Sequence, residues 1–401
     1  MSNNNNLISK IFSSVTINAL TSIISYVSFL LLARAGSEED FGYYLYLLAI
    51  SGIILSVVTF SSEKIFSKVA SLNSNSYALS ITMSVKIFLF ILFTCLFALG
   101  NLVNLNFDPL IYVFLINIFF IQGLFEAKLK IIVLSVILLL ERITFLFLII
   151  LLLNFYDFNL TVYISYAISV TFSLLLQYIF NNTEIQKIKI FTFKKIWLHM
   201  ISYTPVVLLM LSQLSYGYFS RIILEYKFTI QLFASISIAF QIINLIGIFQ
   251  NQIDKIFRPL IVNSANSFEL LSIAKKYFIF TTLPVILISY ILYLFSEPLI
   301  YFLFDGKYNQ SAIFLSVLAP IGLTINLLRF QDIIFLNINK NNINLAINVI
   351  FSVLMLTALM LPFGYLSVSD YLLIIVLSQY LQVLTSSLVI IYLFQDANLN
   401  K

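Results

Sequence analysis

The sequence has almost none of the residues that build disulfides and metal centres. Its one cysteine, Cys95, excludes an intrachain disulfide, and its one histidine, His199, has no Cys, Asp or Glu neighbour at metal-ligand spacing. There is no Walker motif and no Ser-His-Asp arrangement. We therefore predict a chain that is not an enzyme and has neither metal nor cofactor. Coupling to a proton or sodium gradient stays open.

Charge is also scarce, at 10% of residues against 61% hydrophobic residues. A soluble domain of 401 residues cannot cover that much apolar surface with so few charges, so the composition predicts a polytopic membrane protein. The net charge of +5 comes from basic residues spread over short loops. This distribution indicates membrane topology and argues against a nucleic-acid partner.

Twelve apolar runs are close to the length that crosses a hydrocarbon core, about 17 to 25 residues. The predicted fold is an all-α polytopic membrane protein with about twelve transmembrane helices in two six-helix bundles. The first run is too long for a signal-peptide core of about 7 to 15 residues and is taken as an uncleaved span. The predicted spans are residues 11–33, 41–60, 84–104, 109–126, 131–153, 160–180, 201–220, 231–250, 277–296, 312–336, 343–361 and 370–394.

One polar, basic stretch divides the chain near its middle. We predict an N-terminal bundle over 1–180, a cytoplasmic basic linker over 181–200 and a C-terminal bundle over 201–401. The linker carries four lysines against a single Glu184. Two interpretations stay open: the linker lies along the inner leaflet and meets anionic headgroups, or it is a solvated loop.

Basic residues also predict the orientation of the chain. With both termini in the cytoplasm, sixteen of the 22 Lys and Arg residues fall inside, Lys86 among them, and the predicted spans contain two. The remaining four are predicted outside: Arg34, Arg221, Lys227 and Lys307. This bias follows the positive-inside rule.

Two places within the spans carry ionisable residues, whose burial in hydrocarbon costs at least about 2.5 to 3.5 kcal/mol each. Glu141 and Arg142 lie near the middle of the fifth span. Because adjacent residues point about 100° apart on a helix, we expect each to need a partner on another span or water in a cavity. Arg329 and Asp332 share one face of the tenth span at i,i+3, so they are expected either to pair or to line a cavity.

Three prolines, Pro205, Pro284 and Pro320, fall within predicted spans seven, nine and ten. Each removes a backbone hydrogen bond, so each is a candidate hinge or a static kink. Arg34 closes the first span, where an interfacial role is the simpler interpretation, and Lys64 is equally a topology marker.

Three segments resemble one family of membrane transporters. Residues 34–44 (RAGSEEDFGYY) resemble the turn after the first span of bacterial polysaccharide exporters. Residues 303–308 (LFDGKY), followed by Ser311-Ala312, resemble their external segment before span ten, and Gln331 with the polar turn 337–342 also fits. With the twelve-span layout, the whole chain resembles an O-antigen repeat-unit flippase of the Wzx type, in the multidrug/oligosaccharidyl-lipid/polysaccharide (MOP) exporter superfamily.

The resemblance implies translocation of an undecaprenyl-pyrophosphate-linked oligosaccharide across the bacterial inner membrane, by alternating access. A diphosphate needs cations, preferably Arg. From the midspan charges and the resemblance, we predict a cationic cavity lined by substrate-binding candidates Arg34, Glu141, Arg142, Arg329 and Asp332, with Lys64 and Arg258 at its inner mouth. Membrane lipids, a polysaccharide polymerase and a chain-length regulator are the candidate partners. The family often has Asp-Arg at the end of span seven, where this chain has Ser220-Arg221.

Two other functions are considered. A cation-coupled multidrug exporter of the same superfamily would need an acidic residue in the first span; none lies between Ile11 and Ala33, and Glu141 is the nearest substitute. A membrane polysaccharide polymerase would be expected to present a large external loop, and no predicted external connection is long enough to fold by itself.

Overall fold

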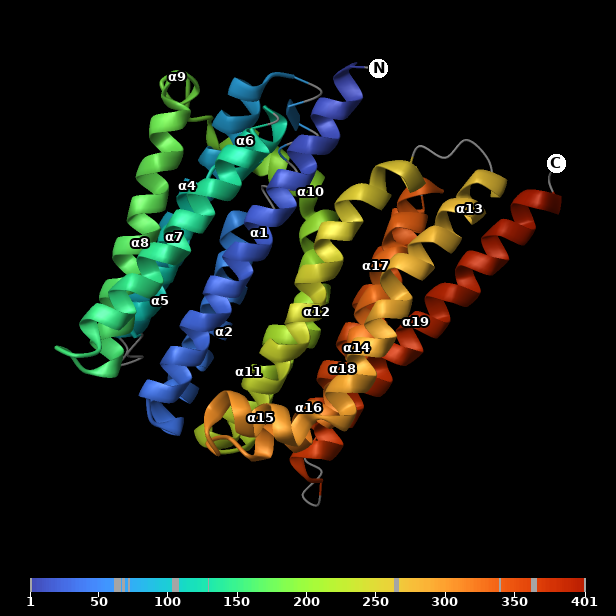
Figure 1. Cartoon of the computed structure of the whole chain (residues 1–401). Helices are drawn as coiled ribbons and strands as arrows, with labels where there is room; N and C mark the ends of the chain where they lie inside the picture. The colour runs from blue at the N-terminus through green and yellow to red at the C-terminus, as the bar shows by residue number, and fades with distance from the viewer. Residues whose placement is uncertain are drawn as a thin grey trace. The chain divides into compact units, whose positions relative to one another are not determined.

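The computed structural model describes residues 2–60, 66, 69–70, 73–102, 108–128, 130–262, 267–338, 340–361 and 366–399. Regular structure in these ranges is entirely helical (Figure 1). Among the described residues, eleven helical segments are long and apolar enough to cross a membrane, and one shorter apolar segment covers Ile111–Ala127. The predicted all-α polytopic fold is therefore confirmed. The chain divides into two compact units, Met1–Leu211 and Ser212–Lys401.

In the first unit, helix α7 packs against both α1 and α8, and α2 packs against α4 and α5. The helices of this unit are α1 (Ser2–Ala35), α2 (Glu38–Thr59), α4 (Asn75–Leu102), α5 (Pro109–Leu115), the 3-10 helix η1 (Ile116–Phe119), α6 (Gln122–Ala127), α7 (Ile131–Leu152), α8 (Phe158–Phe180), α9 (Asn182–Ile185) and α10 (Phe193–Leu214), which reaches the second unit.

In the second unit, α12 packs against α16 and α17, and α19 packs against α17 and α18. Its elements are the π-helix η2 (Ser215–Phe219), α11 (Ser220–Lys227), α12 (Ile230–Val262), α13 (Ser267–Tyr277), the π-helix η3 (Phe278–Thr282), α14 (Leu283–Leu294), α15 (Ser296–Phe304), α16 (Gln310–Leu318), α17 (Ile321–Asn337), α18 (Asn341–Met360) and α19 (Val368–Leu399).

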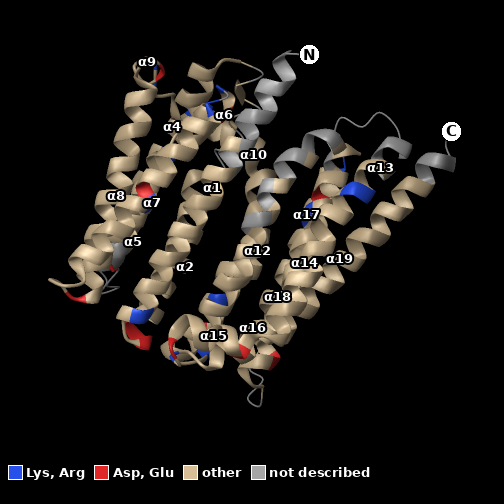
Figure 2. Cartoon of the chain, viewed as in Figure 1, with Lys and Arg blue, Asp and Glu red and all other residues tan. Residues whose placement is uncertain are grey.

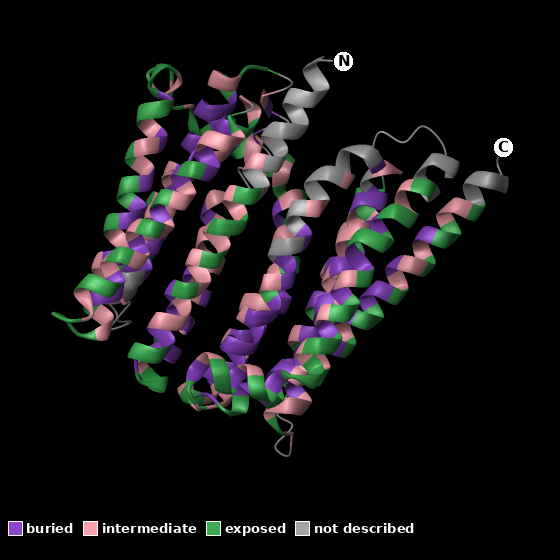
Figure 3. Ribbon diagram, viewed as in Figure 1, coloured by how far each residue is buried: buried purple, intermediate pink, exposed green. Residues whose placement is uncertain are grey.

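Helix α8 shows how these helices distribute polar and apolar residues. Every fourth residue along one face is polar and almost fully buried: Thr161, Ser165, Ser169, Ser173, Gln177 and Asn181. Its exposed residues include large apolar ones such as Ile168 and Ile179. Small polar residues let helix backbones approach closely in lipid, which offers no hydrophobic drive to association. The buried face of α8 is therefore polar, and large apolar residues are exposed on its other faces. Buried and exposed residues alternate along the helices of both units (Figure 3).

The turn between α1 and α2 forms the motif recognised in the sequence. The Ser37 side chain accepts a hydrogen bond from the Asp40 backbone N–H at 3.0 Å, so Ser37 caps α2. A Cβ on Gly36 would meet the Phe158 ring at 2.8 Å, so glycine is required where α1 meets α8. The motif therefore has a local structural role, in addition to any role in transport.

The turn after α15 forms the second motif. Asp305, Gly306 and Tyr308 all have positive φ, and the Phe304 and Tyr308 rings pack edge to face with centroids 5.5 Å apart. Both rings are buried, at 0% and 2% exposure. The turn thus folds back onto its own aromatic residues.

Candidate functional site

The fourth predicted span, residues 109–126, is broken. It consists of α5, η1 and α6, with Phe120 and Ile121 outside helical structure. Sequence analysis predicted one continuous helix here, and this prediction is wrong. A break in a span leaves backbone groups that water cannot satisfy inside hydrocarbon, so neighbouring protein groups must satisfy them.

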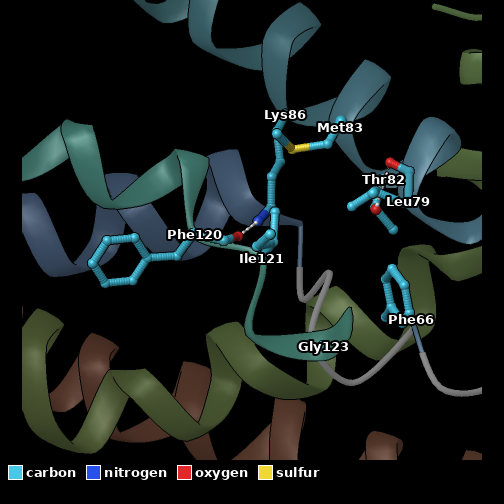
Figure 4. A pocket seen from close by; sticks show the side chains of 8 residues that line it. All are labelled: Phe66, Leu79, Thr82, Met83, Lys86, Phe120, Ile121 and Gly123. Atoms are coloured by element: carbon cyan, nitrogen blue, oxygen red, sulfur yellow. Dashed lines mark hydrogen bonds between the residues drawn. The ribbon is translucent and has the colours of Figure 1, made fainter. Parts of the chain in front are cut away.

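Two side chains from other helices satisfy this break. Lys86 Nζ, from α4, donates to the Phe120 carbonyl oxygen at 2.7 Å (Figure 4). Gln177 Oε1, from α8, accepts a hydrogen bond from the Ile121 N–H at 3.0 Å. Lys86 is 5% exposed and Gln177 is fully buried. Side chains of α4 and α8 therefore stabilise the break and join these two helices to the broken span.

The span that contains Lys86 was predicted to begin at residue 84, and this boundary is wrong. Helix α4 begins at Asn75, so Lys86 lies about three turns into a candidate span, Asn75–Ala98. The sequence reading started the span too late because Ser76, Ser80, Thr82 and Ser84 lower the local hydropathy. The hydroxyls of Ser80, Thr82 and Ser84 bond within the helix, as Ser84 does to the Ser80 carbonyl at 2.7 Å, so they are compatible with a membrane helix.

A small cavity lies beside Lys86 (Figure 4). It is lined by Phe66, Leu79, Thr82, Met83, Lys86, Phe120, Ile121 and Gly123. Its free space of about 10 Å³ has room for roughly one water molecule. A sugar or diphosphate does not fit in this volume. The cavity is therefore a feature of the packing around the broken span and not a substrate site.

Glu141 and Arg142 lie near the middle of α7. Arg142 Nη2 lies 3.4 Å from Glu141 Oε1, so the adjacent pair does make contact, although sequence analysis expected each to need a partner elsewhere. The Glu141 side chain is 2% exposed and that of Arg142 is 35% exposed. Glu141 Oε2 is buried and has no hydrogen-bond partner. The pair therefore leaves one carboxylate oxygen unsatisfied inside the first unit.

The buried face of α7 that carries Glu141 points into the first unit. One turn further on, the Phe145 ring packs edge to face against Tyr166 of α8, with centroids 5.9 Å apart. The Tyr166 hydroxyl accepts a hydrogen bond from Asn117 Nδ2 at 2.6 Å, so α7, α8 and η1 converge there. The region between α7, α8 and η1 therefore contains hydrogen-bonded side chains, and it lies next to the broken span.

In the second unit, Asp332 of α17 is the end of a chain of amide hydrogen bonds. Gln213 Nε2 donates to Asp332 Oδ2 at 3.0 Å, and Asn344 Nδ2 donates to Asp332 Oδ1 at 2.7 Å. Asn348 Nδ2 in turn donates to Asn344 Oδ1 at 3.0 Å, and Gln382 Nε2 donates to Asn348 Oδ1 at 2.9 Å. The network joins α10, α17, α18 and α19. Both carboxylate oxygens of Asp332 therefore accept hydrogen bonds.

Arg329, one turn before Asp332, reaches a different helix. Its Nη1 donates to the Gly247 carbonyl oxygen of α12 at 3.0 Å. Arg329 is half-buried, and a Cβ on Gly247 would lie 3.4 Å from its Nη2. The guanidinium thus ties α17 to α12 while Asp332 ties α17 to α18. The charged face of α17 is therefore involved in packing against α12 and α18.

Arg221 is a buried cation that sequence analysis placed outside the membrane. It is 2% exposed, and its guanidinium lies over the Tyr218 and Phe240 rings at 4.9 and 5.8 Å. Its Nε donates to the Gly217 carbonyl at 2.7 Å, and its Nη1 is buried without a hydrogen-bond partner. Part of the sequence signal was available: Tyr218 precedes Arg221 by three residues, which is helical spacing. Span seven extends to Lys227, beyond the predicted end at residue 220.

The other predicted site residues are less informative. Arg34 is exposed at the end of α1. Lys64 lies outside the described residues, and Arg258 lies in α12 with a side chain outside the described set. Within the described parts of the chain, no group of three His, Cys, Asp or Glu residues could hold a metal ion.

The three candidate hinge prolines have different settings. Pro205 lies inside α10, which continues into the π-helix η2. Pro284 lies in the first turn of α14, directly after the π-helix η3. Pro320 lies between α16 and α17, so it ends one helix and does not bend a continuous one. Their roles as hinges stay predictions.

Charged residues lie mainly near helix ends, with long uncharged stretches between them (Figure 2). Away from the first and last turns of the helical spans, the first unit has buried or half-buried Lys86 and Arg142 against Glu141. The second unit has Arg221 and Arg329 against Asp332. Among the described side chains, each unit therefore has two interior cations and one interior carboxylate.

The described helices define a multi-pass membrane protein, with eleven candidate spans and one shorter apolar segment. Similar solved structures include a multidrug resistance MATE family transporter of the MOP superfamily. Its inward-facing form has 14% identity and a TM-score of 0.65, over 95% of this chain and 96% of that one. Its outward-facing form has 12% identity and a TM-score of 0.64, over 98% and 97%. The eukaryotic MATE transporter AtDTX14 has 14% identity and a TM-score of 0.62, over 95% and 94%.

No family model matches the sequence, and no curated protein matches it. At these identities the likeness extends to the fold. The chain thus has the fold of MATE transporters in the MOP superfamily, while its substrate must be argued from its own residues.

Proposed function

We propose that this protein is a flippase that moves undecaprenyl-pyrophosphate-linked oligosaccharide repeat units across the bacterial inner membrane by alternating access, for surface polysaccharide biosynthesis. A sugar head cannot cross about 30 Å of hydrocarbon by itself. The MATE-like fold over nearly the whole chain supports a transport role. The motifs at residues 34–44 and 303–308 support the oligosaccharide branch of the superfamily.

The observation that carries this proposal is the excess of interior positive charge. Each unit contains two cations against one carboxylate among its described interior side chains. Buried charges are costly in a membrane, so a net excess of interior positive charge is retained where it meets an anion during function. A diphosphate supplies that anion, and the fork of an arginine side chain binds its oxygens in pairs.

Arg142 is the residue proposed to meet the headgroup most directly in the first unit. Its side chain remains 35% exposed although its partner Glu141 is buried, so it has access beyond the pair. In the second unit the proposal assigns the same role to Arg329. Arg34, Lys64 and Arg258 are proposed at the ends of the path, with Asp332 holding the network behind Arg329.

The test measures which leaflet holds the lipid-linked repeat unit in a strain that lacks the protein, using a membrane-impermeant reagent on oriented vesicles. We expect the unit to be trapped on the cytoplasmic side, and wild-type protein to release it. Arg142→Ala is expected to release it at less than about one tenth of the wild-type rate, the effect of losing one charge-assisted hydrogen bond of about 1.5 to 3 kcal/mol.

Two variants serve as controls. Arg142→Lys keeps the positive charge and is expected to retain more activity than Arg142→Ala. Lys130→Ala removes an exposed charge at the start of the same helix and is expected to behave as wild type. Periplasmic exposure of the unit without the protein, or full activity of Arg142→Ala at wild-type expression, would refute the proposal.

Multidrug export is the second candidate, favoured by the multidrug resistance transporters among the similar structures. Glu141, a buried carboxylate with an unpartnered oxygen, would then be the ion-coupling residue. Proteoliposomes with an imposed proton or sodium gradient distinguish the two functions. Gradient-driven export of a lipophilic cation, lost in Glu141→Gln, would favour drug export.

The proposed function also implies partners and an energy source. A polysaccharide polymerase and a chain-length regulator would act on the translocated unit at the same membrane. Proton or sodium coupling is proposed as the energy source, since the sequence has no nucleotide-binding motif. Transport in vesicles without nucleotide, with and without each gradient, tests this point.

A further inference from the structure

The segment 186–192, between the short helix α9 and helix α10, has no helical structure. Two of its backbone N–H groups donate to serine side chains of α4, so its path is fixed. The Lys189 backbone N–H donates to Ser80 Oγ at 3.1 Å, and the Phe191 N–H donates to Ser84 Oγ at 3.0 Å. Both serines are almost fully buried, at 3% and 2% exposure. We call residues 186–197 the strap.

Aromatic contacts extend this attachment. The Phe191 ring lies 5.1 Å from Tyr77, and the Phe193 ring lies 5.5 Å from Phe88. The α4 residues involved, from Tyr77 to Phe88, recur at helical spacing on one face of the helix. The strap is thus held at four points along three turns of α4, which excludes a merely solvated loop.

The attachment leaves the charged and large apolar side chains of the strap exposed. Lys187, Lys189, Lys194 and Lys195 are all exposed. Exposed with them are Ile190 at 74%, Phe193 at 60%, and Trp197 at 50%. Basic residues interleaved with exposed aromatic and aliphatic side chains are typical of surfaces that lie at a membrane interface.

The carboxylate nearest the strap does not neutralise it. Glu184 lies 3.2 Å from Lys128 and 4.0 Å from Lys187, so it is shared between two cations. Lys195 lies over the Phe191 ring at 5.2 Å, which orients its charge without neutralising it. The strap therefore has a strong excess of positive charge.

The place of the strap in the chain favours the depth of the headgroups. Residues 181–192 connect α8, which ends at Phe180, to α10, which begins at Phe193 and contributes the last residues of the strap; both helices belong to candidate spans. A segment between the ends of two adjacent spans lies where hydrocarbon gives way to headgroups, the region in which Trp and Lys are enriched.

We propose that the strap is a binding surface for anionic lipid headgroups, with Lys187, Lys189, Lys194 and Lys195 as the cations and Trp197 inserted beside the acyl chains. Phosphate oxygens of the headgroups complement the lysines, and acyl chains cover the exposed apolar side chains. This surface is separate from the proposed transport path, and it holds whichever substrate the protein carries.

Trp197 is the only tryptophan of the chain, so its fluorescence reports on the strap alone. Full-length protein is reconstituted into bilayers that contain equal fractions of phosphatidylcholine and phosphatidylglycerol. In one preparation only the phosphatidylglycerol is brominated, and in the other only the phosphatidylcholine is brominated. Bromine quenches tryptophan only when the labelled lipid is adjacent. We expect phosphatidylglycerol to be about fivefold more abundant than phosphatidylcholine beside Trp197. This is the ratio that one lysine–headgroup contact of about 1 kcal/mol produces.

A pair of matched variants tests the role of the lysines. Lys194→Gln/Lys195→Gln is expected to reduce the preference by at least about half, and replacing all four strap lysines to abolish it. Lys275→Gln/Lys276→Gln removes another adjacent, exposed lysine pair, from α13, and is expected to leave the preference unchanged. About 1 M salt, with a screening length of about 3 Å, is expected to weaken the wild-type preference.

Wild-type protein alone suffices to overturn the proposal. Equal quenching by the two brominated lipids would mean that Trp197 contacts the bilayer without selecting anionic headgroups. Absence of quenching by either lipid would place the strap away from the membrane and would point to a soluble polyanion or protein as its partner. Neither result bears on the flippase assay, so the two proposals fail separately.

Discussion

The two units contain similar interior charges, but the hydrogen-bond partners of their interior carboxylates differ. In the second unit, both oxygens of Asp332 accept hydrogen bonds from amide side chains, and the network continues through Asn348 to Gln382. In the first unit, Glu141 contacts only the adjacent Arg142 among the interactions described for it, and one of its oxygens is unpartnered. Lys86 meanwhile serves a backbone carbonyl. A satisfied carboxylate fixes helices, whereas an unsatisfied one is available to a proton, ion or ligand.

The largest expected effect comes from breaking the amide network. Asp332→Ala removes the acceptor of the exposed Gln213 amide and of the buried Asn344 amide, and an unsatisfied buried donor costs about 1 to 3 kcal/mol. We expect a loss of about 3 kcal/mol in the free energy of unfolding, measured by denaturant titration of the purified protein in detergent. Glu297→Ala, which removes an exposed carboxylate from the same unit, is the control. Equal stability of the two variants would contradict the network's role.

The second effect concerns the broken span. Lys86→Met retains the length of the side chain but leaves the Phe120 carbonyl without this donor, at an expected cost of about 2 kcal/mol. Thermal unfolding, compared with Lys130→Met at an exposed position, measures it. Because the break adjoins α4 and α8, hydrogen exchange should accelerate first around residues 116–124. Unchanged exchange there would show that the break does not depend on Lys86.

The comparison is sharpened by neutralising the two carboxylates in parallel. Glu141→Gln is expected to cost less than about 1 kcal/mol, because its unpartnered oxygen makes no hydrogen bond to lose. Asp332→Asn is expected to cost more, since one of its two acceptor positions becomes a donor that faces another donor. Chemical unfolding of the two variants, side by side, tests the order. A larger cost for Glu141→Gln would reverse our assignment of the fixed and available carboxylates.

The smallest expected effect on stability compares one glycine from each unit. Gly36→Ala places a Cβ 2.8 Å from the Phe158 ring, which must shift, so we expect a loss of about 1 kcal/mol. Gly217→Ala, in the π-helix η2, meets nothing within 4 Å and is expected to be neutral or slightly stabilising. Melting temperatures of the two variants provide the measurement. Identical shifts would mean that the Gly36 contact is not limiting.

The fold was largely predictable from the sequence, but the candidate site was predictable only in part. Long apolar runs give the spans directly because the bilayer imposes their length. Glu141, Arg142, Arg329 and Asp332 were found because a charge in an apolar run is conspicuous. Lys86 was missed because serines around it made the start of α4 resemble a loop. Hydropathy averages over a window and does not register that a hydroxyl can bond within its own helix.

The sequence by itself determined that this is a helical, multi-pass membrane protein with about twelve spans and a basic midpoint, since hydrophobic length and the distribution of lysines do not depend on neighbours. Only the tertiary structure decided which polar groups meet. The capping of the broken span by Lys86 and Gln177, and the amide network at Asp332, join residues far apart in the chain. Hydrogen bonds act over about 3 Å, so composition and spacing cannot reveal such partners before the helices are packed.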